Sequence, residues 1–449
     1  MSRSWLETRR LLALSWPMIV TNLAWLGMRF TDTVFAGRIS SADLAGISVG
    51  GDIWIAVFLF LLGLLLAVSP TVAHQVGAGE TTRVGHSVRQ SAWLAILFTL
   101  PAMLIMISGE PLMRFIGVDP EVIPIAGGYL DAIVLGLPAM ALYTVLRHTT
   151  EAVSHTRPLL LVAIISVILN IFADWVFMYG KLGVPAMGAI GTGYASALVQ
   201  WVMFISMLVY MLRARLYRPY AIFSRFEWPA APELKALFLL GFPIAIAVFM
   251  EGSMFSAVGL MLATLGKTVV AGHTIAINWT ALMFMVPLGF AGGITVRVGQ
   301  ALGRGDPQAA RFAGWIGVSL CTLFMALSAL ALLLFADSII SIYTSDAAVS
   351  AVAFSLLMVA AIFQVFDGGQ VALAGVLRGY KDTRAPMIYT VIAYWLLGFP
   401  TAWYFGLYLG WGAPWVWVGL IVGLGAAGLM MGWHFVRRGA AECRQQTVM

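Results

Sequence analysis

Long apolar segments alternate with short polar ones along the whole chain. Each apolar segment runs for about 20 residues or more with few charges, which is the length that a helix needs to cross a bilayer. Glycine and proline gather where the segments end, as in Gly77–Gly79 and Gly303–Pro307. The pattern predicts an all-α polytopic membrane protein with twelve transmembrane helices. The expected spans are 11–36, 47–73, 90–108, 122–146, 159–179, 188–212, 235–264, 270–296, 312–335, 347–377, 386–409 and 413–436.

Composition and charge agree with a membrane protein. Of the 449 residues, 61% are hydrophobic and only 10% are charged, too few to cover the surface of a soluble domain. Arginine and lysine favour alternate loops, so the positive-inside rule predicts an inner-membrane protein with both termini in the cytoplasm. The net charge of +6 does not indicate nucleic acid, because the basic residues lie in loops without an interleaved basic and aromatic surface.

The two halves of the chain resemble each other at an offset of 226 residues, the separation of Pro17 and Pro243. Gly63 matches Gly289 at the same offset. Six predicted spans separate the copies, so both copies have the same orientation, a layout that many transporters use. We expect an N-terminal six-helix lobe at 1–212, a cytoplasmic linker at 213–233, and a C-terminal six-helix lobe with a short tail at 234–449. The linker is basic and aromatic, which suits a positive-inside loop or a contact with lipid headgroups.

Two carboxylates lie deep in apolar spans of the second half. Glu251 is the only charged residue between Ala236 and Leu265, and Asp367 lies in a stretch that also contains Gln364. A charge at membrane depth costs about 3 kcal/mol or more, so these acids are expected to hold a proton or bind a cation. A pair that faces one cavity would exchange protons in a coupled way. The alternative is a hydrogen-bonded acid with a purely structural role.

A second polar group is predicted in the first half. Asn170 and Asp174 are four residues apart and share one helix face. Together with Asp32 and a hydroxyl such as that of Thr192 they offer the oxygen ligands that a hard cation such as Na⁺ prefers. Arg29 lies three residues before Asp32, so a neutralised Arg29–Asp32 ion pair is the competing interpretation.

Methionine and aromatic residues line the eighth predicted span. Met283 and Met285 follow Asn278, which is the repeat counterpart of Asp52. Such residues pack against lipid or against other helices. They also suit an adaptable cavity for flat cationic ligands, through thioether and cation–π contacts.

Enzyme motifs do not match the chain. It has no Gly-x-Ser-x-Gly, no His-Glu-x-x-His and no phosphate-binding glycine loop followed by lysine. The pair Asn170-x-x-x-Asp174 suits a Mg²⁺-diphosphate site of a membrane prenyl transferase, but no second acidic cluster lies at that depth. We therefore expect a protein that is not an enzyme and needs no cofactor.

Several stretches carry a family resemblance over nearly the whole chain. They are Thr31-Asp32-Thr33-Val34-Phe35-Ala36-Gly37-Arg38, Ala271-Gly272-His273-Thr274-Ile275-Ala276-Ile277-Asn278, Pro287-Leu288-Gly289, Val296-Arg297-Val298-Gly299-Gln300-Ala301-Leu302-Gly303 and Leu377-Arg378-Gly379 with Asp382-Thr383. In these stretches the chain resembles the MATE (multidrug and toxic compound extrusion) transporters, most closely their NorM branch.

The resemblance implies two six-helix lobes arranged as a V and alternating access to a central cavity. It implies export of amphipathic, often cationic drugs in exchange for Na⁺ or H⁺, by a protein that functions as a monomer in the bilayer. By position, Glu251 and Asp367 match the acids of the C-terminal lobe. Asp32, Asn170, Asp174 and Thr192 match a set proposed for cation coupling in the N-terminal lobe. Helix kinks are implied at Pro17 and Pro243.

Two residues depart from the family pattern. Phe363 stands where related proteins carry a tyrosine near the acid of the C-terminal lobe, which removes one oxygen ligand. Arg29 competes with a cation beside Asp32. Within the same superfamily a lipid-linked oligosaccharide flippase is the alternative function. It would need a strongly cationic cavity for its phosphates, whereas Arg29 is the only basic residue deep in a predicted span.

Overall fold

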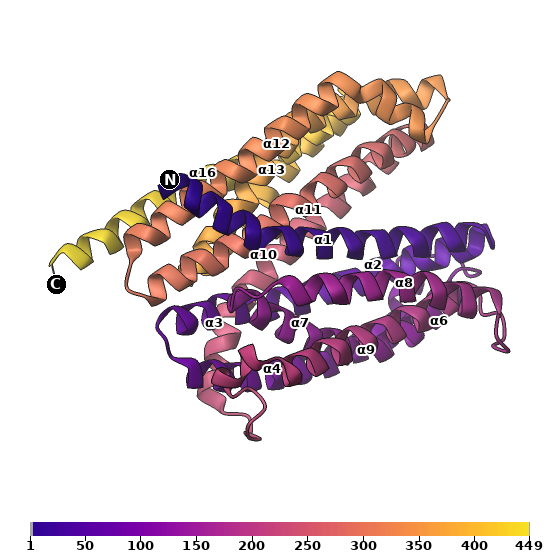
Figure 1. The fold of residues 1–449 in the computed structure, drawn as a ribbon. Coiled ribbons are helices and arrows are strands. Elements are labelled where there is room, and N and C mark those ends of the chain that lie inside the picture. Colours follow the sequence, from indigo (N-terminus) through magenta and orange to yellow (C-terminus); the bar gives the residue numbers. More distant parts are fainter. Residues whose placement is uncertain (1–2, 449) are drawn as a thin grey trace. The chain divides into compact units, whose positions relative to one another are not determined.

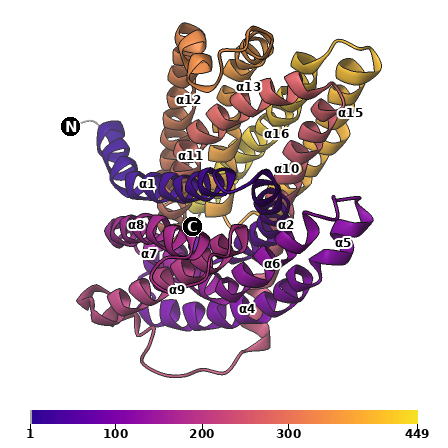
Figure 2. The ribbon, with the colours of Figure 1, turned by 90° about the vertical axis from the view of Figure 1, so that its right-hand side faces the viewer.

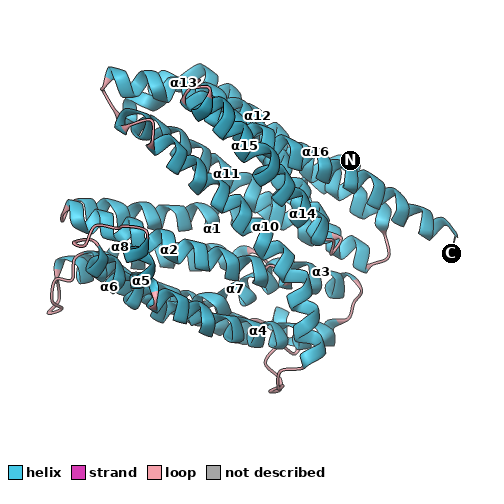
Figure 3. Ribbon diagram, turned by 180° about the vertical axis from the view of Figure 1, so that it is seen from behind, coloured by secondary structure: helices cyan, strands magenta, loops and turns pink. Residues whose placement is uncertain are grey.

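The computed structural model describes residues 3–448 and confirms the all-α architecture. Within these residues, twelve helical segments are long and apolar enough to cross a membrane, and each overlaps one predicted span. Helices account for nearly all of the described chain, and short loops join them (Figure 3). The helices of the first half are α1 (Arg3–Gly37), α2 (Ser41–Leu65), α3 (Val68–Gly77), α4 (Thr81–Ile107), α5 (Gly109–Phe115), α6 (Ile123–Ile133), η1 (Val134–Gly136), α7 (Leu137–Ala152), α8 (Arg157–Tyr179), α9 (Ala189–Arg213) and η2 (Arg215–Tyr220).

The second half repeats the arrangement with longer helices (Figure 1). Its helices are α10 (Ala231–Ala263), α11 (Lys267–Gly303), α12 (Pro307–Tyr343), α13 (Ala347–Gly379), α14 (Arg384–Val391), η3 (Ile392–Gly398), α15 (Phe399–Thr401), η4 (Ala402–Tyr408) and α16 (Ala413–Val448). The segments η3 and η4 are π-helical and lie in the eleventh span. π-Helical segments are rare and concentrate at functional sites.

The chain forms two compact units whose bounds differ from the halves of the sequence. The N-unit is Val20–Ala245, and the C-unit comprises the chain up to Ile19 and from Ile246 onward. Both α1 and α10 therefore begin in one unit and end in the other. The change of unit falls two residues after Pro17 and two residues after Pro243. A proline inside a helix removes one backbone hydrogen bond, so each crossing point lies where its helix is weakest.

Within the N-unit, α9 packs against α6, α7 and α8, and α4 packs against α7. Figure 2 shows α8 and α9 side by side with α4 on the same bundle. Within the C-unit, α13 packs against α11, α12 and α16. A side chain on the inner faces of α9 or α13 is therefore surrounded by protein, and Asp367 on α13 is buried.

The repeat is visible in the turns and in close backbone contacts. Gly79 and Gly305 both adopt positive φ, at 74° and 73°, in the turns that follow α3 and α11. A Cβ on Gly63 would lie 2.5 Å from Cα of Ala245, and one on Gly289 would lie 2.9 Å from the backbone nitrogen of Ile19. Glycine at 63 therefore lets the start of α10 pack closely within the N-unit, and glycine at 289 lets the start of α1 pack closely within the C-unit.

Candidate functional site

In the N-unit, α1 and α8 bring Asp32, Asn170 and Asp174 together. Asn170 Nδ2 donates a hydrogen bond to Asp32 Oδ1 at 3.0 Å. Asp174 lies one turn further along α8 and interacts directly with Asp32. All three side chains are buried. The four-residue spacing on α8 aims the amide and the carboxyl at the same side of α1.

This cluster has buried oxygens without hydrogen-bond partners among the described residues. They are Asn170 Oδ1 and both carboxyl oxygens of Asp174. Buried polar groups in folded proteins nearly always have partners, and two adjacent carboxylates need a shared proton or a cation between them. The donor set, two carboxyls and an amide oxygen, is the kind that hard cations prefer.

Two other residues predicted for this site point elsewhere. Thr192 Oγ1 donates to the sulfur of Met178 at 2.9 Å, so its proton is directed to the thioether and not to the acids. The guanidinium of Arg29 lies over the ring of Trp25, 5.8 Å from its centroid, and the side chain is exposed. Asp32 therefore has its hydrogen bond from Asn170 and only a longer-range attraction to Arg29.

The sequence interpretation missed a tyrosine at the N-unit cluster. Tyr129 on α6 is buried and lies within electrostatic range of both Asp32 and Asp174. A Cβ on Gly50 of α2 would lie 2.7 Å from the ring of Tyr129. The missing side chain at Gly50 therefore lets the ring lie against α2.

In the C-unit, Glu251 on α10 and Asp367 on α13 are electrostatic neighbours. Asp367 is buried, and its Oδ1 has no hydrogen-bond partner among the described residues. Glu251 lines a crevice of about 10 Å³ together with Tyr394 and Gly423. That volume is close to the minimum that a single water occupies, so the crevice admits a water or an ion of similar size.

Tyr394 is the second residue that the sequence interpretation missed. It is buried in the π-helical η3, within electrostatic range of Glu251 and Asp367. Its hydroxyl has no partner among the described residues. A Cβ on Gly423 of α16 would lie 3.2 Å from the ring, so glycine there admits the tyrosine. The carboxyl pair thus has a phenol beside it, although position 363 carries no hydroxyl.

Phe363 and Gln364 on α13 have different surroundings. The ring of Phe363 packs edge-on against Phe255 and Trp417, with centroids 6.0 and 5.5 Å away. Gln364 accepts a hydrogen bond from Ser328 at 3.2 Å, and its Nε2 has no partner in the described chain. Phe363 is therefore a packing residue, and Gln364 extends the polar face of α13.

The remaining predicted cavity residues lie on α11. Asn278 is exposed, and Met283 and Met285 are half-buried. Among the described residues no group of three or more histidines, cysteines or acids could hold a metal ion. A cation at either acid pair would accordingly rely on neutral oxygens for its other ligands.

Comparison with known proteins begins with a family profile described as MatE. It matches residues 17–176 and again residues 243–404. The two matches start at Pro17 and Pro243, the positions that define the internal repeat.

Curated relatives match over nearly the whole chain. The multidrug resistance protein PmpM of Pseudomonas aeruginosa is 42% identical over 98% of this chain and 93% of its own length. The multidrug resistance protein NorM of Vibrio vulnificus is 39% identical over 95% of this chain and 94% of its own length.

Solved structures share the fold. The eukaryotic MATE transporter AtDTX14 superposes with a TM-score of 0.90 at 18% identity, over 99% of this chain and all of that one. An outward-facing multidrug resistance MATE transporter superposes with a TM-score of 0.89 at 19% identity, over 98% of this chain and 97% of that one. At these identities the likeness establishes the fold alone.

Proposed function

Since the chain belongs to the MATE family of transporters, we propose that it exports amphipathic, often cationic drugs as a secondary antiporter driven by Na⁺ or H⁺. Its relatives at 42% and 39% identity are named multidrug resistance proteins. The family is one of transporters, so the protein is not an enzyme, and the prenyl transferase alternative is set aside.

The observation that carries the proposed coupling is a pair of neighbouring acids in each unit, Asp32 with Asp174 and Glu251 with Asp367. Glu251 is half-buried, and the other three acids are buried. Both pairs include carboxyl oxygens without partners among the described residues. An acid pair of this kind changes its proton or sodium occupancy when its access to water changes. An ion that binds one facing state more tightly than the other shifts the equilibrium between them.

In the C-unit, Glu251 and Asp367 would carry the exchanged ion. Glu251 lines the crevice, and Asp367 is a buried electrostatic neighbour of Glu251. The Tyr394 hydroxyl can donate to a carboxylate or offer an oxygen to a cation. We assign the crevice to proton or sodium entry because its volume fits one small species.

In the N-unit, Asp32 and Asp174 with the Asn170 oxygen would form the second cation site. The amide orientation supports this role. Because Asn170 donates to Asp32, its oxygen is turned away from that bond and is available to a ligand. Thr192 is a supporting residue of α9 in this proposal and not a ligand.

We place the protein in the inner membrane as a monomer with cytoplasmic termini. The support is the concentration of arginine on one side of the twelve spans, including the linker between η2 and α10. Cysteines placed in the linker and in the loop between α8 and α9 would test this orientation by their accessibility to an impermeant maleimide in intact cells.

The decisive experiment uses purified protein in liposomes with Na⁺ and pH gradients imposed separately. We expect one or both gradients to drive ethidium accumulation. One charge that crosses 100 mV contributes about 2.3 kcal/mol, so a membrane potential should change the rate if net charge moves. Transport that responds to neither ion gradient would exclude antiport.

A further inference from the structure

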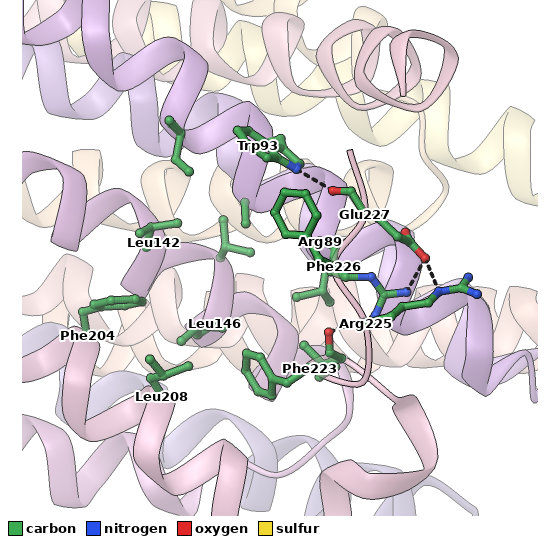
Figure 4. Close-up of a pocket in the computed structure, with 15 residues that line it drawn as sticks. Arg89, Trp93, Leu142, Leu146, Phe204, Leu208, Phe223, Arg225, Phe226 and Glu227 are labelled. Atoms are coloured by element: carbon green, nitrogen blue, oxygen red, sulfur yellow. Dashed lines mark hydrogen bonds and ion pairs between the residues drawn. The ribbon is translucent and has the colours of Figure 1, made fainter. Parts of the chain in front are cut away.

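A pocket on the N-unit lies where residues Ile222–Glu227 of the linker cover α4, α7 and α9 (Figure 4). Its volume is about 500 Å³, within the ~300–1,000 Å³ typical of small-molecule sites. The walls are mainly apolar, with Leu142 and Leu146 from α7, Phe204 and Leu208 from α9, and Phe223 from the linker. None of these residues belongs to the acid clusters.

Hydrogen bonds to α4 fix the linker over the pocket. Arg89 donates to the carbonyls of Ala221 and Ile222 at 2.6 and 2.9 Å and to Glu227 Oε1 at 2.8 Å. Trp93 Nε1 donates to the Glu227 carbonyl at 2.8 Å. The side chain of Arg89 is 12% exposed. These bonds make the pocket a defined site.

Among the residues that line the pocket, basic side chains outnumber acidic ones. Glu227 accepts hydrogen bonds from both Arg89 and Arg225, so two guanidinium groups face one carboxylate. Arg225 uses its Nε for this bond, and its side chain is 71% exposed. Its outer nitrogens are thus presented to a ligand, in the fork that matches phosphate oxygens.

The apolar wall continues onto a surface of α4 that faces lipid. Ile96 lines the pocket, and Leu97, Leu100 and Leu104 are exposed along the same transmembrane helix. Beside the mouth, Phe226 and Trp228 are exposed, and tryptophan is a residue type that concentrates at the membrane interface. An acyl chain can therefore enter the pocket from the bilayer without crossing water.

We propose that this pocket binds one anionic phospholipid from the leaflet on the linker side. One of its two acyl chains lies among Leu142, Leu146 and Phe204, and its phosphate is held by Arg225. The lipid then contacts α4, α7, α9 and the linker together, so it stabilises the docked linker. The proposal uses an apolar interior and a cationic rim, and it is independent of which ion drives transport.

The test is native mass spectrometry of the delipidated full-length protein, titrated with dioleoyl phosphatidylglycerol and dioleoyl phosphatidylcholine. The wild type should bind one phosphatidylglycerol more tightly than phosphatidylcholine. Arg225→Gln should weaken phosphatidylglycerol binding about fivefold, as expected for one arginine at a membrane surface. It should weaken phosphatidylcholine binding less, because the choline cation of that lipid offsets the charge of its phosphate. Arg218→Gln removes the same charge from the same linker but does not line the pocket, and it should keep the preference.

Variants that fill the pocket with a large side chain provide a second test of the proposal. Ala92→Trp, or Leu208→Trp from the facing wall, should reduce the binding of both lipids, whereas Leu104→Trp on the exposed face of α4 should not. The melting temperature of each variant confirms that it is folded. Equal binding of the two lipids to the wild type would overturn the proposal, as would an equal loss in Arg218→Gln. Unchanged phosphatidylglycerol binding in both filled variants, or its displacement by ethidium at the same site, would also overturn it.

Discussion

Each unit places a buried tyrosine beside a pair of neighbouring acids. Tyr129 accompanies Asp32 and Asp174, and Tyr394 accompanies Glu251 and Asp367. Tyr129 and Tyr394 are not related by the 226-residue offset, so the two units reach the same combination from different helices. A phenol can donate to a carboxylate or lend its oxygen to a cation, which suits a group whose ion occupancy changes.

The acids of the C-unit should be indispensable for coupling. Glu251→Gln and Asp367→Asn keep the side-chain volume but remove the ionisable group, so each should lower ion-driven ethidium efflux from everted vesicles by at least about tenfold, the effect of only about 1.4 kcal/mol. Glu110→Gln on the exposed α5 is the matched control and should retain activity. Wild-type efflux in both acid variants would remove these residues from the mechanism.

Tyr394 should tune that coupling. Tyr394→Phe keeps the packed ring but removes the hydroxyl beside Glu251 and Asp367. We expect ethidium efflux to fall severalfold, with a changed dependence on pH or Na⁺. The hydroxyl would no longer be available to donate to an acid when that acid is ionised, a bond worth about 1.5–3 kcal/mol. Tyr404→Phe in η4 is an exposed control. Identical ion dependence in wild type and Tyr394→Phe would assign the ring to packing alone.

The sequence points to the acids but not to their tyrosines. A lone carboxylate in a long apolar span stands out, and the four-residue spacing of Asn170 and Asp174 places both on one face. Tyr394 lies far from Glu251 in the sequence, in a span with two π-helical segments. Those segments change the register of 3.6 residues per turn, so helical periodicity cannot show which way Tyr394 points. The hydrogen bond from Thr192 to Met178 was not predictable either, since only the packing brings the two side chains together.

At the scale of helices, small residues set how closely α1 and α10 approach their neighbours. Gly289→Ala would place a methyl group 2.5 Å from Ile19 Cγ1, and Gly63→Ala would place one equally close to the Ala245 backbone. Each should destabilise the protein by about 1–3 kcal/mol through overpacking, measured as a lower melting temperature. Gly127→Ala in α6 meets nothing within 4 Å and is the matched control. An unchanged melting temperature in Gly289→Ala would show that α1 moves away from α11 at no cost in stability, and it would contradict this prediction.

The linker is held by a carboxylate whose protonation should release it. Hydrogen bonds from Arg89, with others from His86 and Arg225, outweigh partial burial and hold the pKa of Glu227 at about 2. The pKa is lower in the folded state, so Glu227 stabilises that state above its ordinary pKa of about 4.3, and this contribution is lost as the pH falls toward 2. The difference in melting temperature between wild type and Glu227→Gln should therefore be largest above pH 5 and shrink toward pH 3.

A matched variant separates this effect from general acid denaturation. Glu233→Gln alters a more exposed acid, 3.6 Å from His86, and should change the melting temperature little at either pH. A difference between wild type and Glu227→Gln that grows on acidification would contradict the assigned role of Glu227.

The spans were predictable because hydrocarbon thickness sets a minimum length for each apolar run. Their ends were less predictable. The ninth span runs from Pro307 to Tyr343 and so extends beyond the expected 312–335. The backbone is non-helical at Phe335, so the expected end falls at a kink, after which the chain returns to helix as far as Tyr343. Local capping explains part of this extension. Asp306 caps α12 by accepting from the backbone nitrogen of Ala309 at 2.8 Å, ahead of Pro307 at its first position.

At the scale of the whole molecule, the starts of α1 and α10 each belong to the unit formed mainly by the other half of the chain. We call these segments the exchanged helix starts, and the division of the sequence into halves does not reveal them. Hydropathy locates the six-span repeat but carries no information about which bundle a helix start packs on. Glu7 and Glu233 match at the 226-residue offset. Glu7 pairs with Arg297 in the C-unit, and Glu233 lies near His86 in the N-unit. The repeat therefore places an acid at the same position of both exchanged segments, although the partners Arg297 and His86 are not related by the offset.

The Glu7–Arg297 pair should anchor the start of α1 in the C-unit. Two nitrogens of the Arg297 guanidinium donate hydrogen bonds to the two carboxyl oxygens of Glu7, both at 2.8 Å, and Glu7 is buried. Removal of one partner from a buried pair costs about 3–5 kcal/mol, so Glu7→Gln should lower the melting temperature clearly. The exchange Glu7→Arg with Arg297→Glu should recover part of the loss. The neighbouring Arg10→Gln, at an exposed position, should have little effect.

The exchange of helix starts also constrains the order in which the protein can be made. The ribosome must deliver Ala245 before the N-unit is complete, because the start of α10 belongs to it. The C-unit, in turn, needs a segment that emerged first, before any of its other helices existed. Neither bundle can close around its own consecutive sequence, so insertion of the first half must leave the start of α1 accessible until the second half arrives.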